Sequence, residues 1–284
     1  MPGRQKPAVL VITSTVARGS IGGRAATFAL ERLGFPVWQV ATVTLPWHPG
    51  QGRADRIVPD AAAFETLLSD LARSPKLGEI GGILTGYLGA PGQAAAIAGL
   101  IDAVKAARPD ALYLCDPVMG DHGTLYVPQA TAEAIRDHLA PRADLLTPNP
   151  TELAFLARTA PEGRDALIAA ARSLKARRVA VTSAAVEADS TETLLVSADA
   201  TIAARHAQIT GRVTNGTGDL FAALLLAHLL DGLSDAEALR LTAGGVMAAL
   251  DGAVRLGTDE LPLASIQDAL VAPTIPVTIT DDRP

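Results

Sequence analysis

The stretch Leu112-Tyr113-Leu114-Cys115-Asp116-Pro117-Val118-Met119-Gly120-Asp121 contains a short apolar run that is followed by two carboxylates. The run does not alternate polar and apolar residues, which is typical of a parallel strand covered by helices on both faces. In open α/β sheets, ligands bind beyond the carboxyl ends of the strands. Asp116 and Asp121 stand at such an end, where two carboxylates can bind Mg²⁺ directly or through water. A polar loop with a turn at Pro117 is the structural alternative.

Runs of the same kind recur along the chain, at residues 8–12, 37–43, 82–85, 145–147 and 179–182. The segments between them have helical periodicity, as at residues 64–71 and 97–104. This alternation predicts an α/β fold with a doubly wound, mostly parallel central sheet and helices on both faces. Residues 192–198 and 201–209 indicate a β excursion before a helical C-terminal third. There, Ser234 and Glu237 predict a capping box that opens a helix near residues 235–250.

Composition excludes several classes of protein. Of the 284 residues, 49% are hydrophobic, which is ample for a large core. The net charge of −6 and the pI near 5.4 lack the basic footprint of a nucleic-acid binder. The single cysteine, Cys115, cannot form an internal disulfide and fits a reducing compartment. The apolar runs are too short for a signal-peptide core or for the roughly 20 residues of a membrane span. We therefore expect a soluble, cytoplasmic protein that contacts neither nucleic acid nor membrane.

No linker, low-complexity tract or internal repeat divides the chain, so the sequence predicts one domain over residues 1–284. Residues 1–7 are expected to be a flexible tail. Residues from about 273 to 284 have no helical period, and we expect them to be disordered or to lie on a partner.

The hexapeptide Thr214-Asn215-Gly216-Thr217-Gly218-Asp219 precedes a helical apolar run at residues 220–230. Glycines at a helix entrance let backbone N–H groups turn toward a bound anion, which the helix dipole also favours. Asp219 supplies a base in the same turn. Phosphoryl transfer needs both a group that takes the acceptor's proton and donors for the transferring charge. A glycine-rich turn with a dipole-stabilising aspartate explains the pattern equally well.

Polar residues stand at further strand ends and loops. In Thr147-Pro148-Asn149-Pro150-Thr151-Glu152, the spacing predicts a capping-box variant with Asn149 as N-cap and Glu152 at N3. This structural role is compatible with a carboxylate that faces a metal-bound phosphate. The Thr182-Ser183 pair, His48 and Tyr87 say little by themselves, because solvated or packing roles explain each of them. The sequence has no P-loop, G-x-G-x-x-G, H-E-x-x-H or G-x-S-x-G motif.

Taken together, these segments resemble the ribokinase-like superfamily and, within it, the pyridoxal (vitamin B6) kinases, over about residues 8–250. The resemblance is carried by residues 13–16, 32–35, 85–89, 115–121, 146–152, 181–183 and 216–221. It implies ATP-dependent phosphorylation of the 5′-hydroxymethyl group of pyridoxal, pyridoxine or pyridoxamine. It also implies Mg²⁺, a monovalent cation (K⁺ or Na⁺) and a homodimer.

The resemblance also assigns roles to individual positions. Asp219 matches the catalytic base and contacts the vitamer, and the anion hole is matched by Gly216, Thr217 and Gly218. The metal positions are matched by Asp116, Asp121 and Glu152. The nucleotide contacts are matched by Asp121, Tyr126, Thr147, Glu152, Thr182, Ser183 and Thr217. The pyridine pocket is matched by Ser14, Val16, His48 and Tyr87.

The chain departs from the family pattern around the substrate loop. Arg18 replaces a frequent aromatic residue and Gly23 a frequent asparagine. Pro49 replaces a usual threonine, and Asn215 replaces a lysine or an apolar residue. The nearest alternative is a hydroxymethylpyrimidine kinase of the same fold, which typically has Cys in place of Asp219. A vitamer-binding protein with little turnover is the non-enzyme alternative, although binding alone does not require a base.

Overall fold

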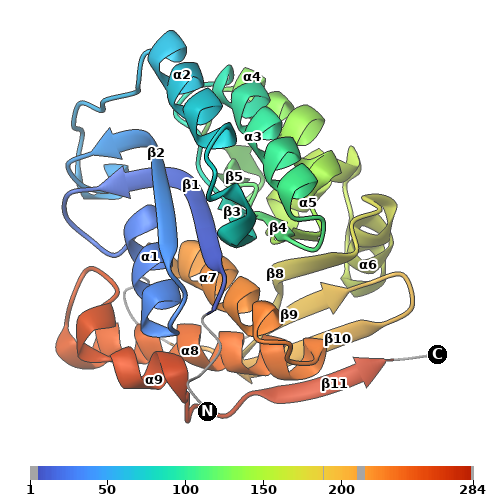
Figure 1. Ribbon diagram of the computed structural model, residues 1–284. Coiled ribbons are helices and arrows are strands. Elements are labelled where there is room, and N and C mark those ends of the chain that lie inside the picture. Colours follow the sequence, from blue (N-terminus) through green and yellow to red (C-terminus); the bar gives the residue numbers. More distant parts are fainter. Residues whose placement is uncertain (1–5, 188, 210–214, 283–284) are drawn as a thin grey trace, which may run out of the picture.

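The computed structural model describes residues 6–187, 189–209 and 215–282. Within these residues, nine strands form one sheet in the order β11-β10-β9-β8-β7-β4-β3-β1-β2 (Figure 1). The strands of this sheet are β1 (Ala8–Val16), β2 (Val37–Leu45), β3 (Ile80–Thr85), β4 (Leu112–Cys115), β7 (Leu145–Leu146), β8 (Arg178–Val186), β9 (Ser190–Val196), β10 (Thr201–Ala207) and β11 (Thr278–Asp282). Pairing is parallel from β2 to β8 and antiparallel from β8 to β11. The predicted α/β fold with a mostly parallel sheet is therefore confirmed.

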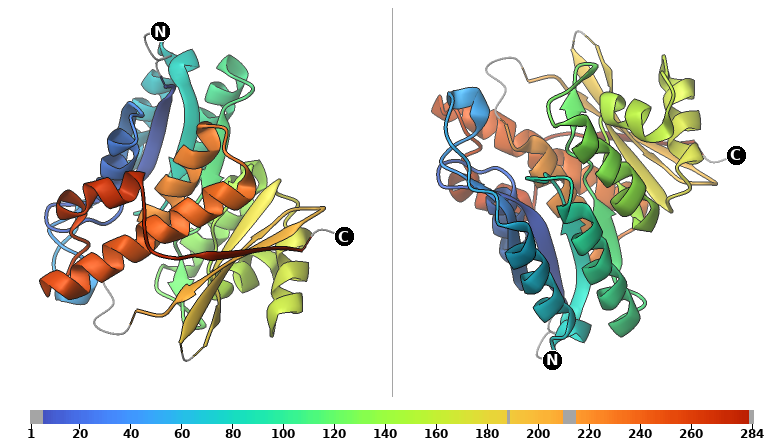
Figure 2. Two further views of the ribbon diagram at one scale, coloured as in Figure 1. Left: turned by 90° about the horizontal axis from the view of Figure 1, so that it is seen from below. Right: turned by 90° about the horizontal axis from the view of Figure 1, so that it is seen from above.

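Helices cover both faces of the sheet (Figure 2). One layer, seen from above in Figure 2, contains α2 (Ala61–Ala72), α3 (Gln93–Ala107), α4 (Gln129–Ala134), α5 (Pro150–Ala157) and α6 (Arg164–Ser173). The other layer, seen from below, contains α1 (Gly23–Arg32), α7 (Thr217–Leu230), α8 (Asp235–Leu256) and α9 (Gln267–Val271). Successive residues of β1 point into opposite layers: Leu10 and Ile12 belong to one buried cluster, Val9 and Val11 to the other. This explains why the strand sequences are apolar without alternation.

Local hydrogen bonds cap the helix ends. Helix α1 ends at Arg32 and is followed by Gly34, whose φ of 86° is left-handed, and the Phe35 N–H donates to the Leu30 carbonyl at 3.0 Å. Before α8, the Ser234 hydroxyl accepts the Glu237 N–H at 3.3 Å. The carboxylate of Glu237 binds Arg240 instead of returning to the N-cap, so this capping box is only half formed.

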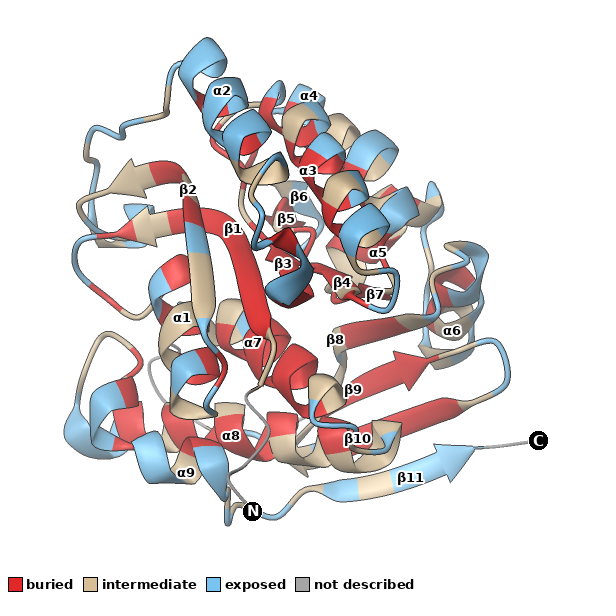
Figure 3. Cartoon of the chain, in the orientation of Figure 1, coloured by how far each residue is buried: buried red, intermediate tan, exposed pale blue. Residues whose placement is uncertain are grey.

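The segment before the C-terminus differs from the sequence expectation, whereas the expected flexibility of residues 1–7 stays a prediction. At the N-terminal end, the Lys6 ammonium donates to Asp231 at 2.7 Å; residues 1–5 lie outside the described part. Near the C-terminus, β11 forms an exposed edge strand beside β10, in a segment for which no regular structure was expected (Figure 3). Strand pairing and an ion pair from Asp282 fix this segment, and neither contact has a signature in the sequence.

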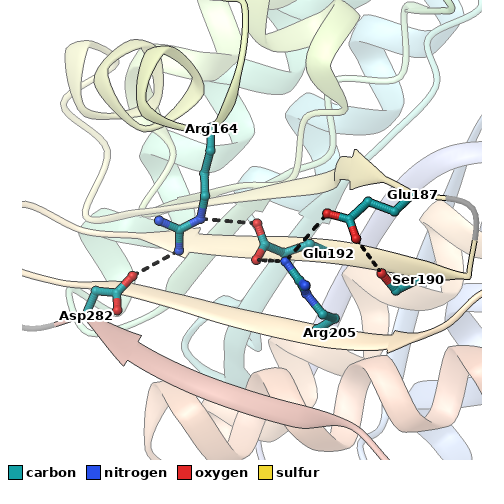
Figure 4. Close-up of polar contacts among 6 residues, drawn as sticks. All are labelled: Arg164, Glu187, Ser190, Glu192, Arg205 and Asp282. Carbon is teal, nitrogen blue, oxygen red and sulfur yellow. Dashed lines mark hydrogen bonds and ion pairs between the residues drawn. The ribbon is translucent and has the colours of Figure 1, made fainter.

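Ion pairs brace the antiparallel half of the sheet (Figure 4). Glu192 of β9 has a side chain that is only 7% exposed, and it pairs with Arg164 of α6 at 3.3 Å and with Arg205 of β10 at 3.5 Å. Arg164 also pairs with Asp282 of β11 at 3.0 Å. A buried carboxylate is tolerated when cations partner it, so these contacts join α6 to three adjacent strands.

Within the described residues, no helix combines the length and apolar character that a membrane crossing requires.

Candidate active site

A pocket of about 810 Å³ opens where β1, β3, β4 and β7 end and along β8. All the site residues predicted from the sequence line this one pocket. They are Ser14, Val16, His48, Tyr87, Asp116, Asp121, Tyr126, Thr147, Glu152, Thr182, Ser183, Gly216, Thr217, Gly218 and Asp219. The strand-end rule indicated the part of the pocket around Asp116 and Thr147, and the family resemblance supplied Ser14, Val16 and Tyr126.

The candidate anion hole is the turn that leads into α7; its sequence motif begins at Thr214, which lies outside the described residues. Gly216 has a φ of 95°, and a Cβ built there would lie 2.4 Å from the Ser20 carbonyl oxygen. Only glycine fits both requirements, so the β1–α1 loop can approach this turn directly. The first-turn N–H groups at Thr217 and Gly218 have no intrahelical acceptors, and the dipole of this 14-residue helix favours an anion there.

Asp219 stands one residue further into the same helical turn. It is half-buried and lines the pocket. Burial raises the pKa of its carboxyl to about 6, although hydrogen bonds from the backbone N–H groups of Gly22 and of Asp219 itself oppose the shift. A pKa near 6 leaves the group ionised at neutral pH, yet close to the range in which a general base works best.

Asp116 forms the floor of the pocket beside the anion hole. Its side chain is buried, and its Oδ1 accepts a hydrogen bond of 2.8 Å from the Thr147 hydroxyl. Burial, followed by repulsion from Glu152 and Asp219, raises the pKa of Asp116 well above its usual range. Crowded carboxylates of this kind are stabilised by a cation.

Glu152 combines a structural contact with a place in the pocket. Asn149 and Glu152 form the predicted capping box of α5. The Glu152 N–H donates to the Asn149 side chain at 3.0 Å, and the Asn149 N–H donates to the Glu152 carboxylate at 2.9 Å. The second carboxylate oxygen accepts the Met119 N–H at 3.0 Å. Burial raises the pKa of Glu152 to about 7 despite these bonds. Capping and pocket lining are thus two roles of one side chain.

The donor set fits Mg²⁺ that arrives with a phosphate. A Cβ built on Gly218 would lie 4.0 Å from Asp116 Oδ2, so this oxygen faces the anion hole. In the described part of the chain, no group of three or more His, Cys, Asp or Glu side chains could hold a metal ion alone. Mg²⁺ usually takes one or two carboxylates and completes its shell with water and phosphate oxygens. Asp121 adds an exposed carboxylate from the hairpin of β5 (Gly120–Asp121) and β6 (Thr124–Leu125), next to Tyr126.

The opposite end of the pocket is lined by Ser14 and Val16 of β1. Ser14 is only 6% exposed, and the chain passes directly over it, because a Cβ on Gly22 would lie 2.5 Å from the Ser14 hydroxyl. Tyr87 follows β3, and its hydroxyl accepts a hydrogen bond of 3.1 Å from Arg56. Sequence reasoning missed Arg56, since a lone arginine in a loop has no distinguishing pattern.

His48 is the N-cap of a short 3₁₀ turn, η1 (Pro49–Gln51). Its Nδ1 accepts the Gly50 N–H at 3.0 Å, so the neutral imidazole carries its proton on Nε2. Burial lowers the pKa of His48, which favours this neutral form. His48 therefore offers one hydrogen-bond donor, Nε2–H, to a ligand in the pocket.

A further part of the pocket was missed by sequence reasoning. It extends along the antiparallel strands, where Thr191, Thr193 and His206 line one wall. Helix α8 supplies the facing apolar wall: Ala243, Val246, Met247 and Leu250. Their spacing of i, i+3, i+4 and i+7 is a signal that could have indicated this wall. Ser183, which also lines the pocket, has a φ of 50°. It lies where the pairing of β8 with β9 shifts register, between Val181 and Ala185.

Residues 78–264 match the family model of phosphomethylpyrimidine kinase. The pyridoxal kinase PdxY of Rubrobacter xylanophilus is 37% identical over 275 residues, which cover 94% of this chain and 94% of the relative. PdxY of Deinococcus radiodurans is 36% identical over 277 residues, with 93% of each chain covered.

Among solved structures, the pyridoxal kinase of Leishmania donovani in complex with ADP and pyridoxamine is similar, with a TM-score of 0.89 and 28% identity. The alignment covers 97% of this chain and 99% of that one. The chain therefore belongs to the pyridoxal kinase family of the ribokinase-like fold.

Proposed function

We propose that this protein transfers the γ-phosphoryl group of ATP to the 5′-hydroxymethyl group of a B6 vitamer: pyridoxal, pyridoxine or pyridoxamine. One observation carries the proposal: Asp219 follows the anion-hole residues Gly216–Gly218 in a pocket that also contains His48. The pyridoxal kinase of Leishmania donovani has been solved in complex with ADP and pyridoxamine and in complex with ADP and pyridoxine, which supports the pairing of a nucleotide with a vitamer.

Asp219 takes the proton of the vitamer hydroxyl as its oxygen attacks the γ-phosphorus and the bond to the β,γ-bridging oxygen breaks. The carboxylate is ionised at neutral pH, because its pKa of about 6 lies below the working pH. The N–H groups at Thr217 and Gly218 donate to the transferring phosphoryl oxygens, where charge must be stabilised. Gly216 keeps this turn open to the nucleotide.

The triphosphate lies beside the acid cluster in this proposal. Asp116, Asp121 and Glu152 would hold Mg²⁺, directly or through water, and a monovalent cation (K⁺ or Na⁺) would also be needed. These cations would supply positive charge to the phosphates and favour the ionised form of Asp116, whose pKa is raised first by burial and then by repulsion from Glu152 and Asp219. The nucleotide contacts are Tyr126, Thr147, Thr182, Ser183, Thr191, Thr193 and His206, with the apolar face of α8 against the base.

The pyridine ring occupies the end lined by Ser14, Val16, His48 and Tyr87. His48 donates through Nε2 to an acceptor on the ring, because its Nδ1 is already engaged by Gly50. Pro49 has no hydroxyl, so it offers no side-chain partner beside His48. We expect this contact to influence which vitamer binds best.

The test is an assay of ADP release with pyridoxal, pyridoxine, pyridoxamine and hydroxymethylpyrimidine as separate acceptors, and with the Asp219→Asn variant as the inactive control. Turnover of the vitamers by the wild type supports the proposal. Binding of a vitamer without ADP release indicates a binding protein instead.

A hydroxymethylpyrimidine kinase is the second candidate, because the matching family model carries the phosphomethylpyrimidine name. The relatives from Rubrobacter xylanophilus and Deinococcus radiodurans, matched over 94% and 93% of this chain, are pyridoxal kinases, which favours the B6 vitamers. A kcat/KM that is higher for hydroxymethylpyrimidine than for every vitamer would reverse this assignment.

The proposal extends to assembly: one domain over residues 1–284, acting as a homodimer. Light scattering after gel filtration measures the molar mass, and a monomer at assay concentration would contradict the dimer.

A further inference from the structure

The segment that carries His48 is held at both ends by one residue, Arg18. Arg18 follows β1, and its backbone N–H donates to the Pro46 carbonyl at 2.9 Å. Its guanidinium donates to Gln51 Oε1 at 2.8 Å, on the last residue of the η1 turn. His48 lies between these two attachment points, so the position of Arg18 restrains the whole turn.

A third loop completes the network. The Arg18 guanidinium also pairs with both carboxylate oxygens of Asp259, at 2.8 Å and 3.3 Å, in the segment after α8. Gln51 Nε2 donates to the same carboxylate at 3.2 Å. Arg18, Gln51 and Asp259 thus bond pairwise, and we name these three residues the clamp. The clamp fastens the His48 turn to the helical layer that carries Asp219.

The turn that the clamp holds lies close to the anion hole. A Cβ on Gly50 would lie 3.7 Å from Asn215 Nδ2, the residue directly before Gly216. Gly50 also provides the N–H that sets the tautomer of His48. If the turn moves away from the pocket, His48 no longer lies at the substrate end. It also loses the hydrogen bond from Gly50 that keeps the proton on Nε2.

We infer that Arg18 is a positioning residue for vitamer binding: together with Gln51 and Asp259, it holds His48 in place at the acceptor site. This inference rests on the proposed function. The side chains of Arg18 and Gln51 bond to each other and to Asp259, at the substrate end of the pocket, so loss of the clamp should weaken vitamer binding without slowing the chemical step. The apparent affinity equals the intrinsic affinity multiplied by the fraction of molecules in which the turn is in place.

The experiment compares Arg18→Ala, Arg18→Asp and the charge-swapped double variant Arg18→Asp/Asp259→Arg with the wild type. Arg142→Ala is the matched control, because Arg142 and Asp102 form a two-pronged pair of similar exposure, at 2.9 Å and 3.0 Å, outside the pocket lining. For each protein, kcat and KM for pyridoxal and for ATP are measured, together with the thermal midpoint and the dissociation constant of pyridoxal by calorimetry.

We expect Arg18→Ala to raise the vitamer KM about two- to fivefold, and Arg18→Asp, which places like charges together, about tenfold. In both variants, kcat and the KM for ATP should stay within about twofold of the wild type. The charge swap should recover most of the loss, and Arg142→Ala should change none of these constants.

Three results would overturn the inference: clamp variants that match Arg142→Ala, a loss of kcat equal to the rise in KM, or a charge swap that recovers nothing. A wild type that neither phosphorylates nor binds any vitamer would refute the proposed function as well. A wild type that is active while the clamp variants are unaffected would refute the clamp alone.

Discussion

Replacing Asp219 by Asn should remove most activity and, at the same time, make the folded protein more stable. Asn has nearly the same shape and can still accept the N–H of Gly22, but it cannot take a proton. Loss of a general base typically lowers kcat by about 10²–10⁴-fold. We expect the KM for ATP to stay within about twofold, because the anion-hole N–H groups remain.

The gain in stability follows from the pKa of the carboxyl. Burial raises it from 3.8 to about 6, so the folded state holds this proton more tightly than the unfolded state. The contribution of Asp219 to the free energy of unfolding therefore falls as the pH rises from about 4 to about 6, and it stays low above that range. The full shift corresponds to about 3 kcal/mol at most, and pocket water reduces it because Asp219 is only half-buried. We expect Asp219→Asn to recover about 1–3 kcal/mol at pH 8 and almost nothing at pH 4.

Two measurements check this reasoning. Denaturant unfolding of both proteins at pH 4, 6 and 8 gives the difference in stability, and kcat/KM against pH gives the acid limb. The wild-type kcat/KM should fall as the pH drops below about 7, because Glu152 and then Asp219 take up protons, with pKa values of about 7 and about 6. A variant that keeps more than about a tenth of wild-type kcat would show that Asp219 is not the base. A variant that is less stable than the wild type at pH 8 would show that burial does not penalise this charge.

Three further predictions concern the other parts of the pocket. Glu152→Gln should raise the Mg²⁺ concentration for half-maximal rate about tenfold; a change in thermal midpoint alone would assign Glu152 to capping only. Gly216→Ala should lower kcat about 10²-fold, because its Cβ would lie 2.4 Å from the Ser20 carbonyl oxygen. Gly232→Ala is the control for backbone strain in activity and stability measurements, because Gly232 has a φ of 79° but no atom within 4 Å of the added Cβ. His48→Ala should lower kcat/KM unequally among the three vitamers, by about 1–3 kcal/mol for each polar group left unpaired, and Pro49→Thr should shift the preference; an equal loss for all three would mean that the loop only controls access.

Much of the fold was predictable because apolar runs report burial on both faces of a sheet. The run at residues 112–115 coincides with β4. Strands β1 and β2 continue beyond the runs at 8–12 and 37–43, into residues that include threonine and serine. The β5–β6 hairpin was missed, since two-residue strands leave no periodic signal. Strand β11 was missed because its side chains are mostly exposed, so backbone pairing with β10 places it rather than an apolar pattern.

The candidate site was predictable to the extent that its residues follow strands. Asp116 and Thr147 come directly after β4 and β7, and parallel strands bring these ends together. The wall formed by Thr191 and His206 was not predictable, because antiparallel strands have no common carboxyl end. On β9, alternate residues face opposite sides: Thr191 lines the pocket, whereas Glu192 pairs with Arg164. Without the register of β8, β9 and β10, either set could face the nucleotide.

The β1–α1 loop connects the vitamer end of the pocket, at His48, with the phosphate end, at the anion-hole turn. The sequence does not indicate this connection. The Arg18 N–H binds the Pro46 carbonyl, the Ser20 carbonyl lies against the anion-hole turn, and the Gly22 N–H donates to the base. All three contacts use backbone atoms of the loop, which any residue provides, so the amino-acid types carry little trace of them. Of the three residues that make these contacts, Gly22 is restricted in type, because a Cβ there would lie 2.5 Å from the Ser14 carbonyl oxygen. A displacement of this loop would therefore move the vitamer turn, the anion hole and the base together, which ties the position of the acceptor hydroxyl to that of the phosphoryl group it attacks.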